Sequence, residues 1–233
     1  MRKLQLGPLH RRVKYGTLMF MLLFVAILKP LVAPTGWGPL ALEAGLVLTL
    51  ISCIAIIGRN RRGVMIASAW AVVPALALVL PSSDLELVPA RLTVMVAFLL
   101  YATFSILLDV FSGQDASVDK LFGSVCAYLM VGICFAMVYL SLDVTVAGSF
   151  AFAGVPSQRL VYEQWTQKYS EFVYYSFITM TTVGYGDILP VTAAARSVAI
   201  TQAVFGQFYM ALMVGRLLAI HLSAISNEPA ARG

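Results

Sequence analysis

The chain has 233 residues, of which 60% are hydrophobic and only 12% are charged, and its mean hydropathy is +0.87. A soluble domain of this length has too little interior to hide so much apolar surface, so lipid must surround much of the chain. The formal net charge is +5. On a membrane protein such a charge is expected to orient the loops across the membrane or to bind anionic lipid. No aromatic-and-basic motif in the sequence points to nucleic acid.

The first element is a basic segment, residues 1–14, which either marks the topology or rests on anionic lipid. Six apolar stretches follow, each long enough to cross about 30 Å of hydrocarbon. The sequence therefore predicts an all-α membrane protein with six transmembrane helices. Pro74 lies inside the third stretch and is expected to kink it. The stretches lie near residues 15–32, 39–58, 64–80, 87–111, 121–142 and 192–222.

The positions of the basic residues set the expected orientation. They cluster in residues 2–14, before the first stretch, and in residues 59–62, after the second. The positive-inside rule places both clusters in the cytoplasm, and six crossings return the C-terminus to the same side. We expect a multi-pass protein of the plasma membrane, the inner membrane if the source is bacterial. Residues 143–191 then face outward.

Two segments before the sixth stretch are not predicted to cross the membrane. Residues 143–169 contain Gly, Pro and charged residues and are interpreted as an outward linker. Residues 171–181 are apolar but too short to span, which predicts a helix that descends only part of the way. Extended backbone at that depth is tolerated where it lines a cavity, so the segment is interpreted as a re-entrant loop. The C-terminal carbonyl groups of such a helix favour a cation.

The sequence Thr-Thr-Val-Gly-Tyr-Gly-Asp occupies residues 181–187, directly after this short helix. Backbone carbonyl groups can replace the water around a cation and still release it, whereas carboxylates bind too tightly for rapid exit. Pointing consecutive carbonyls at one axis requires left-handed dihedral angles at alternate residues, which Gly184 and Gly186 adopt at little steric cost. Val183 and Tyr185 are expected to project away from the axis, and the Thr182 hydroxyl to add one more oxygen. The alternative is an ordinary glycine-rich turn.

Residues 171–216 resemble the pore of the single-pore-loop potassium channels, both prokaryotic and voltage-gated. The resemblance implies a selectivity filter at 181–187 and a homotetramer, because one filter segment per chain cannot surround an ion. It implies K⁺ as the permeant ion, bound by Thr182, Val183, Gly184 and Tyr185, with Gly186 completing the filter, and it implies no cofactor. The predicted domains are a basic segment 1–14, a sensor-like domain 15–111, a pore domain 119–222 and a tail 223–233. The predicted parts of the pore domain are an outer helix 119–142, an outward linker 143–169, a pore helix 171–181, the filter 181–187 and an inner helix 192–222.

Other residues are assigned supporting roles by the same resemblance. Tyr174 and Tyr175 stand where the family often has two Trp residues. Because Ile178 replaces the acid that some bacterial members carry, we expect the Tyr174 hydroxyl to bind Asp187. Tyr175 is expected to contact Tyr185 of a neighbouring copy. Thr181 supports the filter from its first position, and Asp187 also raises the cation concentration at the mouth. Gly206 stands at the family's hinge position, with close helix packing as the alternative, and Arg216 follows near the cytoplasmic end.

The fourth stretch tests whether the first four helices form a voltage sensor. It carries Arg91 and then no basic residue before Asp109. Moving one charge through the membrane is worth about 2.3 kcal/mol per 100 mV, and steep gating needs three or four charges in each subunit. We therefore predict weak voltage dependence. The tail 223–233 is short for a fused nucleotide- or cation-binding domain, so no small-molecule ligand domain is expected.

The remaining ionisable and thiol groups suggest no further site. Glu43 can pair with Arg91, and the acids Asp109, Asp115 and Asp119 either meet Arg59, Arg61 and Arg62 or are solvated at the interface. Cys53, Cys126 and Cys134 lack metal-ligand spacing. His10 and His221 are interpreted as interfacial residues, with a pH-sensing role as the alternative.

Three alternatives to a selective channel are compared with the sequence. An intramembrane serine protease needs a Gly-x-Ser-Gly nucleophile, which the sequence lacks, so no enzyme is predicted. A non-selective cation channel often loses the filter tyrosine, but Tyr185 is present. A regulatory subunit that joins other channels would keep this architecture, and the sequence leaves it open.

Overall fold

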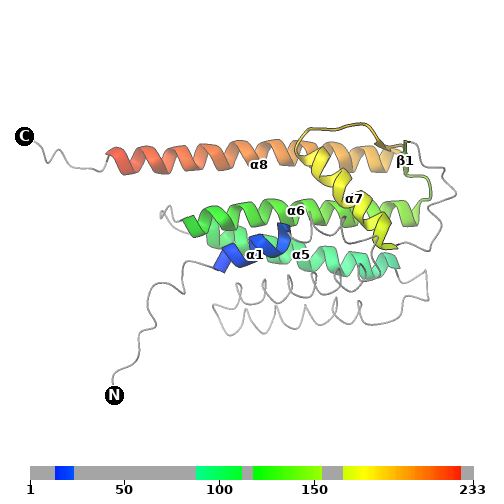
Figure 1. Ribbon diagram of the computed structural model, residues 1–233, viewed down its shortest axis with the longest axis horizontal. Helices are drawn as coiled ribbons and strands as arrows, with labels where there is room; N and C mark the ends of the chain where they lie inside the picture. The colour runs from blue at the N-terminus through cyan, green and yellow to red at the C-terminus, as the bar shows by residue number, and fades with distance from the viewer. Residues whose placement is uncertain (1–13, 24–87, 112–117, 154–164, 227–233) are drawn as a thin grey trace, which may run out of the picture.

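The computed structural model describes residues 14–23, 88–111, 118–153 and 165–226, which form five α-helices and one small sheet (Figure 1). The second and third predicted stretches, and the residues Glu43, Arg59, Arg61, Arg62 and Asp115, lie outside the described residues. So do most of the basic segment 1–14 and the tail after Ser226.

Three of the described helices have the length and composition to cross a membrane. They are α5 (Val88–Phe111), α6 (Val118–Thr145) and α8 (Ala193–Ser226). Each follows a predicted apolar stretch closely, because a long apolar sequence in lipid must satisfy its backbone polar groups internally as a helix. Helix α1 (Lys14–Leu23) lies in the first predicted stretch, whose remaining residues, 24–32, are outside the described part of the chain.

Helix α6 is the central element, since it packs against α1, α5, α7 and α8. In Figure 1 it lies between α8 on one side and α5 on the other. Of its apolar span, 67% is buried within the chain, against 11% of the span in α8. The core is therefore built around α6, and α8 presents most of its side chains outward.

The pore helix begins earlier than predicted. Helix α7 runs from Trp165 to Met180, so it includes residues that the sequence analysis assigned to the linker 143–169. Its first residues, Trp-Thr-Gln-Lys-Tyr-Ser, are too polar to be recognised as an apolar membrane helix, but Gln and Lys are good helix formers. Helix α6 likewise extends to Thr145, beyond the predicted end at 142.

A small antiparallel sheet lies beside the filter segment and was not predicted. Strand β1 (Phe150–Phe152) comes from the linker, and strand β2 (Ile188–Pro190) follows the filter directly. Phe150 pairs with Pro190, Ala151 with Leu189 and Phe152 with Ile188. The linker therefore returns to the filter in space, although at least 35 residues separate the two strands in sequence.

Candidate functional site

The filter segment 181–187 joins the end of α7 to β2 and contains no regular secondary structure. Residues 181–186 are all exposed in the single chain. Val183 is 50% exposed and Tyr185 is 73% exposed. Their side chains therefore find few partners in their own chain, and their expected packing behind the filter would have to come from another copy.

The backbone of this segment alternates in handedness. The φ angle is 60° at Thr182, 51° at Gly184 and 80° at Gly186, whereas Val183 and Tyr185 between them keep negative φ. The expected positive φ at both glycines is present. Thr182 was not expected to share it, because left-handed φ is an outlier for a β-branched residue and costs about 1–3 kcal/mol. Such strain is typical of a functional segment that its surroundings hold in place.

Hydrogen bonds to the pore helix set the direction of two carbonyl groups. The amide groups of Val183 and Gly184 donate to the carbonyl oxygen of Ile178 over 2.9 and 3.2 Å. In a trans peptide the N–H and the C=O point in opposite directions. The carbonyl groups of Thr182 and Val183 therefore point away from α7.

The predicted contact between Tyr174 and Asp187 is formed. The Tyr174 hydroxyl donates to Oδ2 of Asp187 over 2.7 Å, and the Ile188 amide donates to Oδ1 over 3.1 Å. The hydrogen bond to the carboxylate, with a smaller contribution from burial, raises the pKa of Tyr174 to about 12. The hydroxyl therefore stays protonated and remains a donor near neutral pH.

Tyr175 does not lie where the sequence analysis expected it. It is only 4% exposed, and its ring packs against Tyr139 and Phe150 of its own chain with centroids 4.9 and 5.5 Å apart. It therefore offers almost no surface to Tyr185 of a neighbouring copy. The helix periodicity explains this, because Tyr174 and Tyr175 are consecutive and so face different sides of α7.

Thr181 and Thr182 place their hydroxyl groups on nearby carbonyls. Thr181 Oγ1 donates to the Phe177 carbonyl over 2.7 Å, and the same carbonyl also accepts from the Thr181 amide over 2.9 Å. Thr182 Oγ1 donates to the Thr181 carbonyl over 2.7 Å. A hydroxyl oxygen keeps acceptor lone pairs while it donates, so this contact leaves Thr182 able to face a cation.

Gly206 lies where α8 passes the end of the pore helix. A β-carbon at this position would lie 2.5 Å from the Met180 carbonyl oxygen and 2.8 Å from its Cγ. Helix α8 is continuous through this residue. Close packing, the alternative to a hinge, thus has direct support, and the hinge role stays a prediction.

A buried polar network behind the filter was not predicted from the sequence. Tyr139 of α6 donates to Oε1 of Gln202 in α8 over 2.5 Å, and Nε2 of Gln202 donates to Oγ of Ser176 in α7 over 2.6 Å. Ser176 in turn donates to the Gly132 carbonyl over 2.6 Å. All three side chains are fully buried. A glutamine inside an apolar membrane stretch was the available signal, since such residues have a partner or a function.

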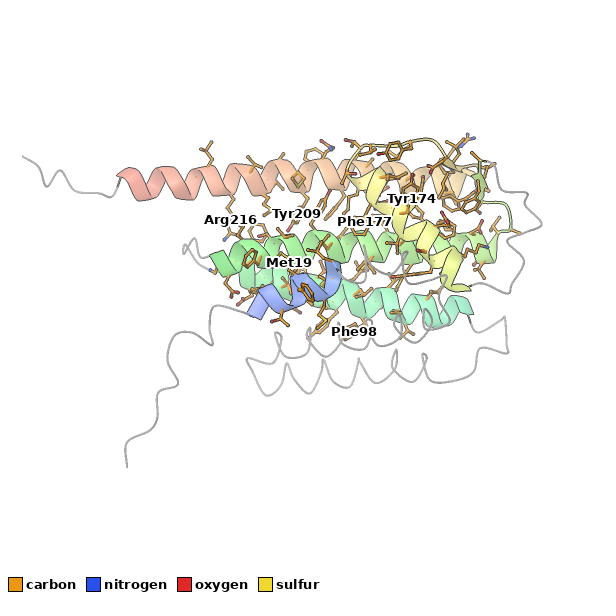
Figure 2. The ribbon with its side chains drawn as sticks, viewed as in Figure 1. Met19, Phe98, Tyr174, Phe177, Tyr209 and Arg216 are labelled. Carbon is orange, nitrogen blue, oxygen red and sulfur yellow. The ribbon has the colours of Figure 1, made fainter. Side chains whose placement is uncertain are left out.

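A second set of contacts joins the helices at the end remote from the filter. Tyr15 donates to Oδ2 of Asp109 over 2.6 Å, and its amide donates to Oδ1 of Asp119 over 3.3 Å. Arg216 of α8 reaches α5, where it donates to the Val110 carbonyl over 2.6 Å and lies over the ring of Phe111 (Figure 2). These acids, for which the sequence suggested arginine partners or solvent, thus have a tyrosine partner among the described residues.

Two comparisons with known proteins cover this part of the chain. A family model described as "Ion channel" matches residues 127–221, from the middle of α6 to the last turns of α8. Protein LctB of Bacillus caldotenax is 32% identical over 100 residues, which are 43% of this chain and 71% of LctB. The chain belongs to this ion channel family. Membership places it among ion channels, which are membrane proteins, and the matched region contains α7, the filter segment and Gly206.

Proposed function

We propose that this ion channel is a homotetramer that conducts K⁺ selectively. The observation that carries the proposal is the backbone of residues 182–186, whose φ angles alternate in sign while two successive carbonyls point away from the pore helix. Stacked carbonyl rings bind a dehydrated cation at several sites without holding it tightly, which is what conduction requires. In this mechanism the carbonyls of residues 182–185 and the Thr182 hydroxyl replace the hydration shell.

Four copies are proposed because one copy cannot surround an ion. In the single chain the filter segment is exposed, and α8 leaves large apolar side chains such as Phe208 and Leu212 uncovered. A closed ring with rotational symmetry would bring four filter segments together at the axis and cover this face of α8. Asp187, held at the end of the segment, would then raise the cation concentration at the mouth.

The proposed channel lies in the plasma membrane with both termini in the cytoplasm. The basic residues before the first stretch and between the second and third support this orientation. The filter then lies toward the outside and the Arg216 contact toward the cytoplasm. Anionic lipid is the proposed partner of the basic residues, since lipid headgroups of the inner leaflet attract such clusters.

The proposal is tested with the purified chain in liposomes that contain no other protein. We expect K⁺ flux down its gradient and a reversal potential that follows K⁺ rather than Na⁺. Flux without this preference would instead indicate a non-selective cation channel. No flux, together with assembly onto another channel, would indicate a regulatory subunit.

A matched pair of glycine variants sharpens this test. Gly184→Ala places a β-carbon on a left-handed residue, which costs about 1–2 kcal/mol per residue and disturbs the carbonyl direction, so we expect K⁺ flux or selectivity to fall at least several-fold. Gly16→Ala is the control, because a β-carbon there meets nothing within 4 Å and its backbone is helical. The mass of the detergent-solubilised complex reports the number of copies.

A further inference from the structure

We propose that residues 149–153, here called the outer strap, are a positioning element that fixes the Asp187 end of the filter. The inference rests on the proposed function for its consequence in conduction, but the contacts that define the strap do not depend on it. The strap is the part of the linker that carries β1, and no role was predicted for it from the sequence.

The strap holds the chain on both sides of β2 through its backbone. The Ala153 amide donates to the Asp187 carbonyl over 2.7 Å, and the Val191 amide donates to the Ser149 carbonyl over 2.8 Å. These bonds define the hydrogen-bonded pairs, so Pro190, which has no amide hydrogen, falls opposite Phe150 in a non-hydrogen-bonded pair. In this register the missing amide hydrogen of Pro190 costs the sheet no hydrogen bond.

Asp187 is consequently held at two points from two elements. Its carbonyl oxygen accepts from the strap, and its carboxylate accepts from Tyr174 of the pore helix. With both contacts made, the last residue of the filter segment has a defined main-chain and side-chain position. Loss of the strap contact would leave only the contacts of the carboxylate, with Tyr174 and the Ile188 amide, to resist displacement.

Phe150 anchors the strap to the helices that carry the filter. Its side chain is 5% exposed, and its ring meets Phe172, Tyr139 and Tyr175 edge-on with centroids 4.9 to 5.5 Å apart. Edge-to-face rings at these distances attract one another and fix orientation. Because Tyr139 belongs to α6 and the other two to α7, the anchor ties β2 to the same packing unit that positions the pore helix.

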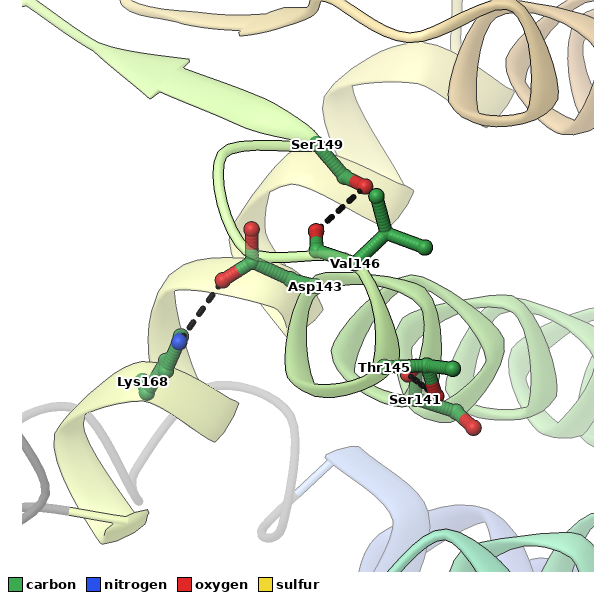
Figure 3. A network of polar contacts seen from close by, with 6 residues as sticks. All are labelled: Ser141, Asp143, Thr145, Val146, Ser149 and Lys168. Atoms are coloured by element: carbon green, nitrogen blue, oxygen red, sulfur yellow. Dashed lines mark hydrogen bonds and ion pairs between the residues drawn. The ribbon is translucent and has the colours of Figure 1, made fainter.

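The turn before the strap is ordered by its own contacts (Figure 3). Gly148 has φ of +81°, and Ser149 Oγ donates to the Val146 carbonyl over 2.7 Å. The end of α6 and the start of α7 are joined beside this turn by an ion pair of 2.7 Å between Asp143 and Lys168. The strap therefore leaves α6 in a fixed direction, as a positioning element must.

The first measurement is hydrogen exchange, which does not depend on conduction. Phe150→Ala is expected to speed exchange several-fold in the peptide covering residues 187–192, where the Val191 amide is bonded to the strap. Phe150→Leu, which keeps much of the apolar volume, should restore most of the protection. Phe104→Ala is the control, since Phe104 is 61% exposed on α5. Unchanged exchange in a folded Phe150→Ala protein would overturn the proposal.

The second measurement is the decay of K⁺ current during sustained opening. Ala153→Pro removes the amide that donates to Asp187, and Ala153→Ser retains it. We expect the proline variant to lose current several-fold faster at low K⁺, and high K⁺ to slow the loss because bound ions hold the carbonyls apart. The proposed role of the strap would be overturned if the proline variant lost current at the same rate as the serine variant, or if K⁺ concentration did not change that rate. If the unaltered chain passes no K⁺ while exchange responds as expected, the proposed function fails and the strap stands.

Discussion

The hydroxyl group of Tyr174 helps to hold the Asp187 side chain in position by donating a hydrogen bond to it. Tyr174→Phe removes the 2.7 Å hydrogen bond and leaves the ring in place. Because the carboxylate then loses a donor that stays protonated near neutral pH, we expect the filter to leave its conducting state several-fold faster, with little loss of assembled protein. Single-channel recording at fixed K⁺ measures this. Tyr101→Phe on α5 removes the same atom away from the filter, and equal behaviour of the two variants would contradict the prediction.

The substitution Gly206→Ala tests whether Gly206 serves as a hinge of α8 or allows close packing against the pore helix. In Gly206→Ala the new methyl group must displace the Met180 carbonyl at the end of the pore helix, 2.5 Å away. Overpacking of this kind costs about 1–3 kcal/mol, so we expect a lower midpoint of thermal unfolding of the solubilised channel. The control is Gly215→Ala in the same helix, where nothing lies within 4 Å. A variant that gates abnormally at unchanged thermal stability would favour the hinge.

Elements as a whole were predicted unevenly, for physical reasons. Helices α5, α6 and α8 follow from sequence because long apolar stretches in lipid have one stable secondary structure. The start of α7 was placed too late because its first turns are polar. Strand β1 was missed because three residues carry no periodic pattern and their partner, β2, is distant in the sequence.

The site was predictable where chemistry is local and not where it depends on packing. Left-handed φ at Gly184 and Gly186 follows from the residue type alone. The positive φ of Thr182 is imposed by its neighbours and opposes its own preference. Tyr175 was assigned to a neighbouring copy because the aromatic partners that bury it, Tyr139 and Phe150, come from distant segments.

The polar network of Gln202 joins three helices and can be tested as a unit. Gln202→Leu removes the acceptor of the buried Tyr139 hydroxyl, whereas the Ser176 hydroxyl keeps its bond to the Gly132 carbonyl. An unsatisfied buried polar group costs about 1–3 kcal/mol. We expect reduced thermal stability, and a double-mutant cycle with Tyr139→Phe should give a coupling of about 0.5–3 kcal/mol. Gln207→Leu is the control for stability, since Gln207 is exposed on the same helix and its side chain makes only a long, 3.5 Å contact with the Thr182 hydroxyl. Additive effects of the two substitutions would show that the network is not cooperative.

At the scale of the whole molecule, the charge of the fourth predicted stretch limits how membrane voltage can act. Helix α5 carries Arg91 near its start and Asp109 near its end, with no basic residue between them. One charge contributes about 2.3 kcal/mol per 100 mV, so we expect a shallow conductance–voltage relation with at most about one gating charge per subunit. Planar-bilayer recording over a wide voltage range measures the slope. A slope that requires several charges per subunit would refute this.

Helix α8 connects the two ends of the described structure. It begins beside β2, where Thr192 Oγ1 accepts from the Ala195 amide over 3.3 Å as an N-cap, and it reaches α5 through Arg216. Tyr209 makes an intermediate contact, donating to the Ser124 carbonyl of α6 over 2.6 Å. Displacement of α8 at one end is therefore opposed by polar contacts along its length.

Because α8 is long and uninterrupted, a small tilt at Gly206 would move its C-terminal end by a large distance. At about 1.5 Å per residue, the arm from Gly206 to Ser226 is about 30 Å long. Tilting it by about 10° would swing its tip through about 5 Å and carry Arg216 about 2.6 Å. That travel is enough to pull the guanidinium off the Val110 carbonyl. A tilt about Gly206 would therefore break the Arg216 contact with α5 before the Tyr209 contact with α6, because Tyr209 lies nearer the pivot.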